Sequence, residues 1–335
     1  MYCRNKLLSA LLLGGLSLSG ITAFADDTTT TNAPAATAEK GVKQHIVVGT
    51  GSESGNYFSM GKDIKSYCED SLSNGSTLEI AKSDGSIDNI IGMNEKRYSA
   101  AIVQEDVMQY FAKTEPRKVN KNRMKVIAGL HMESAHLLIP INYKPDSNEG
   151  FGDMLTSLFD GQSTAPLSLD ALQNQTIGSW GGSMVSAKAL SYFLHLNLKV
   201  QDIPAGKRSD PGIPVLLIGG HPYAPVQQIL DTGKYRLVAI NFDKLKEKAP
   251  FYLKSSVSYK VKGKVETVQT FAVRAMLVGK SFRKESRNVN MSLLANCITD
   301  NLADLADDSE TNPNWGSVYD LEQDNDQSSW AYFPL

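Results

Sequence analysis

The segment that most constrains this chain runs from Ile46 to Tyr57, IVVGTGSESGNY, where a short apolar strand is predicted to pass through a Gly/Ser/Thr turn into a helix. Such a turn leaves the first backbone N–H groups of the helix without partners at the positive end of the helix dipole. The turn is therefore suited to a carboxylate or a phosphate. Gly51 lets a ligand approach the backbone, while Thr50 and Ser52 add hydroxyl groups. The alternative is an ordinary strand-to-helix loop of an α/β protein.

Three catalytic motifs nearly match and fail. The dinucleotide fingerprint G-x-G-x-x-G would need glycine at Ser54, and the nucleophile elbow G-x-S-x-G would need serine at Glu53. The segment from His131 to His136, HMESAH, has its histidines five residues apart within predicted strands, which places them on opposite faces. We therefore expect no enzyme, no metal and no cofactor, with a hydrolase as the less favoured alternative.

The N-terminal segment predicts export. Residues 1–25 combine a basic start, an apolar run and the small-residue exit Ala-Phe-Ala, the pattern of a cleavable secretory signal peptide. Glycines interrupt the apolar run, and it is shorter than the roughly 20 residues that a spanning helix needs. Residues 26–42 are small and polar and are predicted to be a flexible leader. We expect a protein secreted to the periplasm.

The charge, length and cysteines of the exported part indicate its partners, its domain number and a possible disulfide. Removing the two basic residues of the signal leaves 32 basic against 36 acidic residues, a net charge of −4 that argues against nucleic acid as a partner. The remaining length of about 300 residues predicts two domains. The cysteines of this part, Cys68 and Cys297, would pair in an oxidising compartment; two buried free thiols are the equal alternative.

Beyond the first turn, strands and helices alternate in the order of a parallel sheet covered by helices. Polar side chains follow three successive predicted strands at their C-terminal ends, the edge of an open α/β sheet at which ligands bind. These side chains are Thr50, Ser52, Ser83, Ser86 and Gln104.

A second βα series follows two predicted strands at 125–130 and 136–141, which we interpret as a hinge. Residues 143–168 are loop-like and are predicted to be an insertion. We expect lobe I at 43–135, with 270–310 returning to it, lobe II at 136–269, and a tail at 311–335. The aromatic residues of the tail suggest that it packs back on the body.

Five segments, in this order, resemble the TAXI family, the solute-binding proteins of tripartite ATP-independent periplasmic (TRAP) transporters. They are Ile46–Gly51 with Gly55–Tyr57, Asp84–Ser86, Ala101–Asp106, Gly178–Ser183 and Gly219–Pro222. The resemblance covers about residues 44–305. It implies an α/β, two-lobed periplasmic-binding-protein fold of type II with the ligand cleft between the lobes. It also implies a small carboxylate or amino acid as solute, similar to glutamate or glutamine, the membrane subunits of a TRAP transporter as partner, and a monomer. A secreted binding or sensor protein without a transporter is the alternative.

The resemblance places the solute among small-residue turns of both lobes. The ligand-binding residues that it implies are Thr50, Gly51, Ser52, Tyr57, Ser83, Gly85, Ser86, Gln104, Trp180, Gly182, Ser183, Gly220 and Pro222. Tyr57 and Trp180 have core packing as an alternative role. Asp84, where the family pattern has no carboxylate, either faces the ligand, which would favour a cationic group, or caps the following helix.

Overall fold

The computed structural model describes residues 41–143, 166–323 and 328–335. The expected signal peptide, nearly all of the leader and most of the expected insertion at 143–168 lie outside these residues. Within the described part, no helix combines the length and the apolar character needed to cross a membrane.

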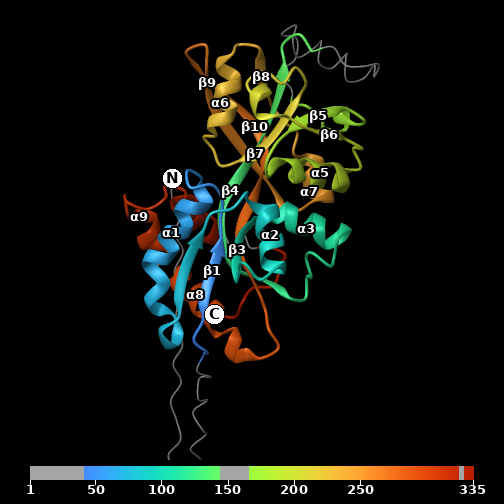
Figure 1. Ribbon diagram of the computed structural model, residues 1–335. Helices are drawn as coiled ribbons and strands as arrows, with labels where there is room; N and C mark the ends of the chain where they lie inside the picture. Colours follow the sequence, from blue (N-terminus) through green and yellow to red (C-terminus); the bar gives the residue numbers. More distant parts are fainter. Residues whose placement is uncertain (1–40, 144–165, 324–327) are drawn as a thin grey trace, which may run out of the picture. The chain divides into compact units, whose positions relative to one another are not determined.

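Ten strands of the described residues form one sheet, in the order β2-β1-β3-β10-β4-β7-β5-β6, with β8 on β4 and β9 on β10 (Figure 1). The strands are β1 (His45–Gly49), β2 (Thr77–Ala81), β3 (Ala100–Gln104), β4 (Met124–Pro140), β5 (Thr176–Ser179), β6 (Lys199–Asp202), β7 (Val215–Gly219), β8 (Tyr235–Val238), β9 (Tyr252–Val261) and β10 (Lys264–Lys280). The helices are α1 (Asn56–Cys68), α2 (Ser86–Asn94), α3 (Glu105–Thr114), α5 (Ser183–Leu194), α6 (Ala224–Asp231), α7 (Asp243–Lys248), α8 (Val289–Asp300), α9 (Leu302–Asp307) and α10 (Trp315–Gln323).

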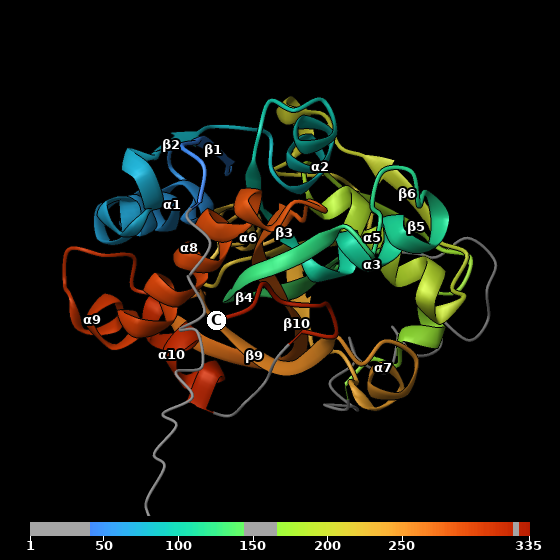
Figure 2. The same ribbon diagram turned by 90° about the horizontal axis from the view of Figure 1, so that it is seen from below.

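Two long antiparallel strands, β4 and β10, join two βα halves. The first part of β4 pairs with β10, and its last residues pair with β7 and β8. We call the half built on β1–β3, α1–α3 and α8–α10 lobe I, and the half built on β5–β9 and α5–α7 lobe II. Lobe I occupies the lower part of Figure 1, and Figure 2 views it from below. Each lobe has its own apolar core, with Met60 and Leu294 in lobe I and Leu190 and Phe271 in lobe II.

Within each lobe the strands of the βα series run parallel, as predicted: β1 lies between β2 and β3, and β5 lies between β6 and β7. In lobe I, β10 lies between β3 and β4 and runs antiparallel to both. In lobe II, β4 lies between β7 and β8 and runs antiparallel to both. Two such lobes, joined by a pair of crossing strands, make up the type II periplasmic-binding-protein fold. The predicted fold class is confirmed.

Three elements differ from what the sequence pattern indicates. The strands expected at 125–130 and 136–141 are one continuous strand, because residues 132–134 pair with β10 and hold the backbone extended. The sequence analysis did not identify β9, whose exposed positions are polar. Residues 282–305 do not form one long helix: the helical part begins at Val289 and is divided at Asn301 into α8 and α9.

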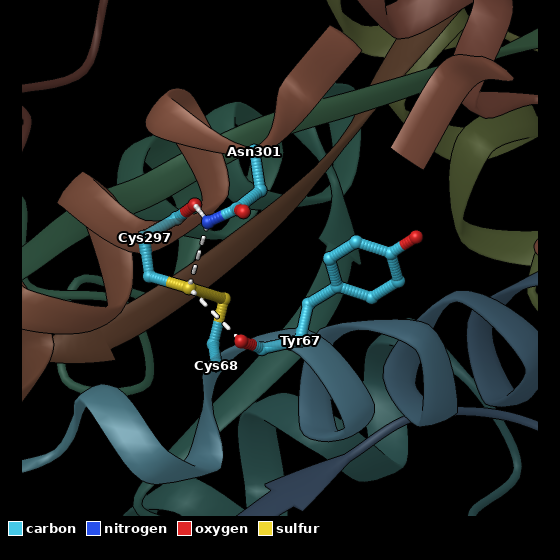
Figure 3. The surroundings of a disulfide bond; sticks show 4 residues. All are labelled: Tyr67, Cys68, Cys297 and Asn301. Atoms are coloured by element: carbon cyan, nitrogen blue, oxygen red, sulfur yellow. Dashed lines mark hydrogen bonds between the residues drawn. A yellow bond between two sulfur atoms is a disulfide. The ribbon is translucent and has the colours of Figure 1, made fainter. Parts of the chain in front are cut away.

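A disulfide joins Cys68, the last residue of α1, to Cys297 in α8 (Figure 3). It links two segments of lobe I that are 229 residues apart in sequence. The side-chain amide of Asn301 donates to the carbonyl oxygen of Cys297 at 2.8 Å beside it. The C-terminal tail does pack on lobe I: Trp315 is fully buried, and Tyr332 bridges to Val126 of β4.

Candidate ligand-binding cleft

A cavity of about 900 Å³ lies between the two lobes. Its walls include every residue in the predicted site except Thr50. These residues are Gly51, Ser52, Tyr57, Ser83, Gly85, Ser86 and Gln104 from lobe I, and Trp180, Gly182, Ser183, Gly220 and Pro222 from lobe II. The turns after β1, β2, β5 and β7 and the end of β3 therefore meet around one space.

The hydroxyl of Thr50 does not reach this space. The side chain is fully buried, and its Oγ1 donates to the carbonyl oxygen of Ala81 at 2.8 Å. Ser83 has a similar internal role, since its Oγ donates to the carbonyl oxygen of Thr50 at 2.9 Å and accepts from the N–H of Gly85 at 3.1 Å. These two hydroxyls fasten the first turn to the second.

Two further hydroxyl groups of the predicted site also form hydrogen bonds inside the protein. The Oγ of Ser86 accepts from the backbone N–H of Gln104 at 3.0 Å. The Oγ of Ser183 accepts from the N–H of Ile218 at 2.9 Å and donates to its carbonyl oxygen at 3.1 Å. The hydroxyls of Thr50, Ser83, Ser86 and Ser183 therefore position the turns around the cavity.

Three helices begin at the cavity without a side-chain cap. The N-cap residues of α1, α2 and α5 are Gly55, Gly85 and Gly182, and none of these helices has a side-chain capping hydrogen bond. Gly85 has φ +89° and Gly181, beside the third cap, has φ +57°, a backbone region in which glycine is favoured. The first-turn N–H groups of α1 and α2 in lobe I thus remain available to a bound anion. In α5 of lobe II the N–H groups of Met184 and Val185 already donate to the carbonyl oxygens of Gly181 and Gly182, which leaves the N–H of Ser183.

Asp84 does not cap α2, which was one of its two predicted roles. Its side chain is exposed at the wall of the cavity, and the N-cap position belongs to Gly85. The backbone N–H of Asp84 lies 3.4 Å from a carboxylate oxygen of Asp88. The remaining expectation, a carboxylate facing the cleft, stays a prediction.

Two aromatic residues of the predicted site line the cavity and also belong to an apolar core. Tyr57 and Trp180 are 8% and 7% exposed, and each belongs to an apolar core while also lining the cavity. The Tyr57 hydroxyl donates to Oε2 of Glu133 at 3.0 Å. Burial, followed by the charge of Glu133, raises the pKa of Tyr57 well above its usual value, so that the hydroxyl keeps its proton.

Two charged residues of the cavity wall were missed by the sequence analysis. Glu133 stands on β4 one residue before that strand meets β7, and it is 9% exposed. Arg208 comes from the loop before β7; its guanidinium lies 5.4 Å from the centre of the Trp180 ring, and its Nε donates to the carbonyl oxygen of Ile203. Glu133 was considered only as part of a metal motif, and the loop around Arg208 carries no pattern that could have identified it.

The motif from His131 to His136 holds no metal cluster. Among the residues that the structure describes, no group of three potential ligands comes together. His131 packs edge-on against Tyr57 of lobe I, whereas His136 shares a hydrogen bond of 2.8 Å with the hydroxyl of Tyr259 in lobe II. Burial lowers the pKa of His136 to about 3, which keeps its ring neutral.

Behind the cavity, polar contacts connect the two lobes. The Oγ of Ser186 in α5 donates to Oε1 of Gln104 at 3.2 Å, and the Tyr252 hydroxyl donates to Oδ2 of Asp106 at 3.2 Å. Burial raises the pKa of the fully buried Asp106 carboxyl to about 7. The start of α3 is therefore a site of contact between the lobes.

Over residues 48–165 the sequence matches the model of the NMT1-like family. No curated protein matches the chain. Similar solved structures include a protein of Bordetella bronchiseptica RB50, with 12% identity and a TM-score of 0.46 over 88% of this chain and 85% of that one. The ligand-binding component of an ABC-type import system from Staphylococcus aureus, with zinc bound, has 11% identity and a TM-score of 0.42 over 87% of this chain and 86% of that one. MatC from Rhodopseudomonas palustris, with bound malate, has 13% identity and a TM-score of 0.44 over 82% of this chain and 88% of that one. Similarities of this size do not identify a ligand.

Proposed function

We propose that this protein is a periplasmic solute-binding receptor that captures a small carboxylate or amino acid and delivers it to the membrane subunits of a TRAP-type transporter. The observation that carries the proposal is the convergence of three helix N-termini, those of α1 and α2 from lobe I and of α5 from lobe II, on one cavity. The resemblance to the TAXI family in the turns that form this cavity supports the transport role.

The physical argument concerns the hydration of a carboxylate. Enclosing the ion between two lobes removes it from water, which is tolerable only where several donors replace the lost hydrogen bonds. The first turns of α1 and α2 and the N–H of Ser183 in α5 supply backbone donors, and Arg208 supplies a positive charge at the wall. A cavity of about 900 Å³ lies within the roughly 300–1,000 Å³ of ordinary small-molecule sites.

A ligand screen by thermal unfolding tests this proposal. A solute at one hundred times its dissociation constant should stabilise the protein by about 2.7 kcal/mol, and for a protein of this size each kcal/mol raises the Tm by roughly 2 °C. We expect at least one small carboxylate or amino acid to produce such a shift and to be recovered chemically unchanged. A panel of both classes that leaves the Tm unchanged would refute the proposal.

Arg208→Ala gives the matching test of the cleft. Loss of a charged hydrogen-bond donor should weaken binding of the carboxylate about tenfold to a hundredfold. Arg283→Ala is the matched control, because Arg283 is exposed and does not line the cavity. Uptake of the same solute by membrane vesicles that contain the transporter subunits, with and without this protein, tests delivery.

A further inference from the structure

Glu133 is the one carboxylate that the crossing strand β4 brings to the cavity wall. It lies where β4 leaves lobe I, since its neighbour Ser134 pairs with Gly219 of lobe II. The Tyr57 hydroxyl donates to Oε2, which fixes the orientation of the carboxylate. The other oxygen, Oε1, faces His131, whose Nε2 is 3.7 Å away.

Among the described residues, His131 is the one basic side chain within 4.0 Å of the Glu133 carboxylate. His131 is fully buried, and neither of its ring nitrogens has a hydrogen-bond partner within the described structure. A buried carboxylate with a single hydroxyl donor and a buried imidazole without a hydrogen-bond partner are costly unless a further polar group reaches them.

Lobe II comes close to His131 and Asn56 of lobe I at Gly220. A Cβ atom added to Gly220 would lie 3.8 Å from Nε2 of His131 and 2.3 Å from Nδ2 of Asn56. A side chain at Gly220 would therefore collide with the Asn56 amide, so glycine lets lobe II pack closely against lobe I beside His131, whose Nε2 is 3.7 Å from Oε1 of Glu133.

We infer that Glu133 receives the ammonium group of the solute, and that the solute is accordingly an amino-acid zwitterion, not a simple mono- or dicarboxylate. An ammonium group supplies three donors and the opposite charge, so it satisfies Oε1 and neutralises the carboxylate. The solute's own carboxylate then lies toward the helix N-termini and Arg208. A solute without the amine leaves Glu133 unpaired beside an anion, which penalises it. The inference rests on the proposed function and specifies its solute class.

The test compares each of the twenty proteinogenic amino acids with the same acid lacking the amine, for example glutamate with glutarate, by calorimetry. Wild-type protein should bind at least one amino acid and its deaminated partner at least tenfold more weakly. Glu133→Gln keeps the size of the side chain and an acceptor for Tyr57 but removes the charge. It should weaken amino-acid binding about tenfold to a hundredfold while changing the deaminated acid less than about threefold.

Glu53→Gln serves as the matched control, because Glu53 is an exposed carboxylate in the first turn that does not line the cavity. Equal affinity of the wild-type protein for an amino acid and its deaminated partner would overturn the inference and leave the proposed function intact. This comparison needs no variant, so it holds even if Glu133→Gln fails to fold. Equal losses for both acids in Glu133→Gln would also overturn it. Wild-type protein that binds neither class would refute the proposed function itself.

Discussion

Removal of the disulfide should cost a large share of the stability of this protein. The bond closes a loop across a sequence separation of 229 residues that includes all of lobe II. The loop-closure relation assigns such a cross-link about 5.5 kcal/mol at 25 °C, and measured values usually fall below this limit. We therefore expect Cys68→Ala/Cys297→Ala to lose about 3–5 kcal/mol of unfolding free energy. With an unfolding entropy of about 2.1 cal/mol/K per residue, 4 kcal/mol corresponds to roughly 6 °C in Tm.

Urea unfolding followed by tryptophan fluorescence measures this loss, because Trp315 reports on lobe I and Trp180 on lobe II. Reduced wild-type protein separates the effect of the bond from that of the lost side chains and should match the double variant within about 1 kcal/mol. The m-value should rise in both, since the unfolded chain is no longer cross-linked. Equal urea midpoints for oxidised and reduced wild-type protein would refute the reasoning, as would free thiols of Cys68 or Cys297 in the denatured, unreduced chain.

Three further predictions concern residues in or near the cleft. Ser183→Ala removes both hydrogen bonds of its hydroxyl to β7, so the unfolding free energy should fall by about 1–3 kcal/mol. Ser52→Ala, at an exposed serine, is the comparison. Equal urea midpoints for the two variants would contradict a structural role of the Ser183 hydroxyl. Gly85→Ala forces a side chain into φ +89° and should cost about 1–3 kcal/mol, against little change for Gly206→Ala, where neither backbone nor space is restrictive. Burial raises the pKa of the Asp106 carboxyl from 3.8 to about 7. Its stabilising contribution is therefore complete below about pH 4 and is lost as the pH rises toward 7; Asp106→Asn should remove this slope from the pH dependence of unfolding, and an unchanged slope would show that another group causes it.

The sequence predicted those parts of the fold that depend on local signals. An apolar strand followed by glycine and serine marks the turns after β1 and β5, and the two-lobed architecture follows from two such series. The unbroken path of β4 was not predictable, because the polar residues from His131 to Ser134 look like a break between strands. They remain extended because β10, some 140 residues later, pairs with them. A pairing of this kind leaves no trace in the local pattern.

The candidate site also has features that could be predicted from the sequence and features that could not. The small-residue turns could be found because their composition serves the local turn geometry. The roles of the hydroxyl groups in these turns could not be predicted, because the partner of Ser183 is the backbone of Ile218 on β7, far away in the sequence. Glu133 and Arg208 are separated by 75 positions and reach one cavity only through the packing of the two lobes. Charged residues at such positions look like any others until the strands are in place.

The position of β10 between β3 and β4 determines how long one edge of β3 stays without its partner strand while the chain is synthesised. All five residues of β3 are buried, yet the strand that covers one of its edges starts at Lys264, 160 residues after Gln104. At roughly 5–20 residues per second, a ribosome leaves that apolar edge bare for about 8–30 s. A partly synthesised chain thus presents a strand edge that invites aggregation. Lobe II is a contiguous piece of the gene, whereas lobe I exists only once both ends of the chain are present, so expression of the N-terminal half alone should yield insoluble protein.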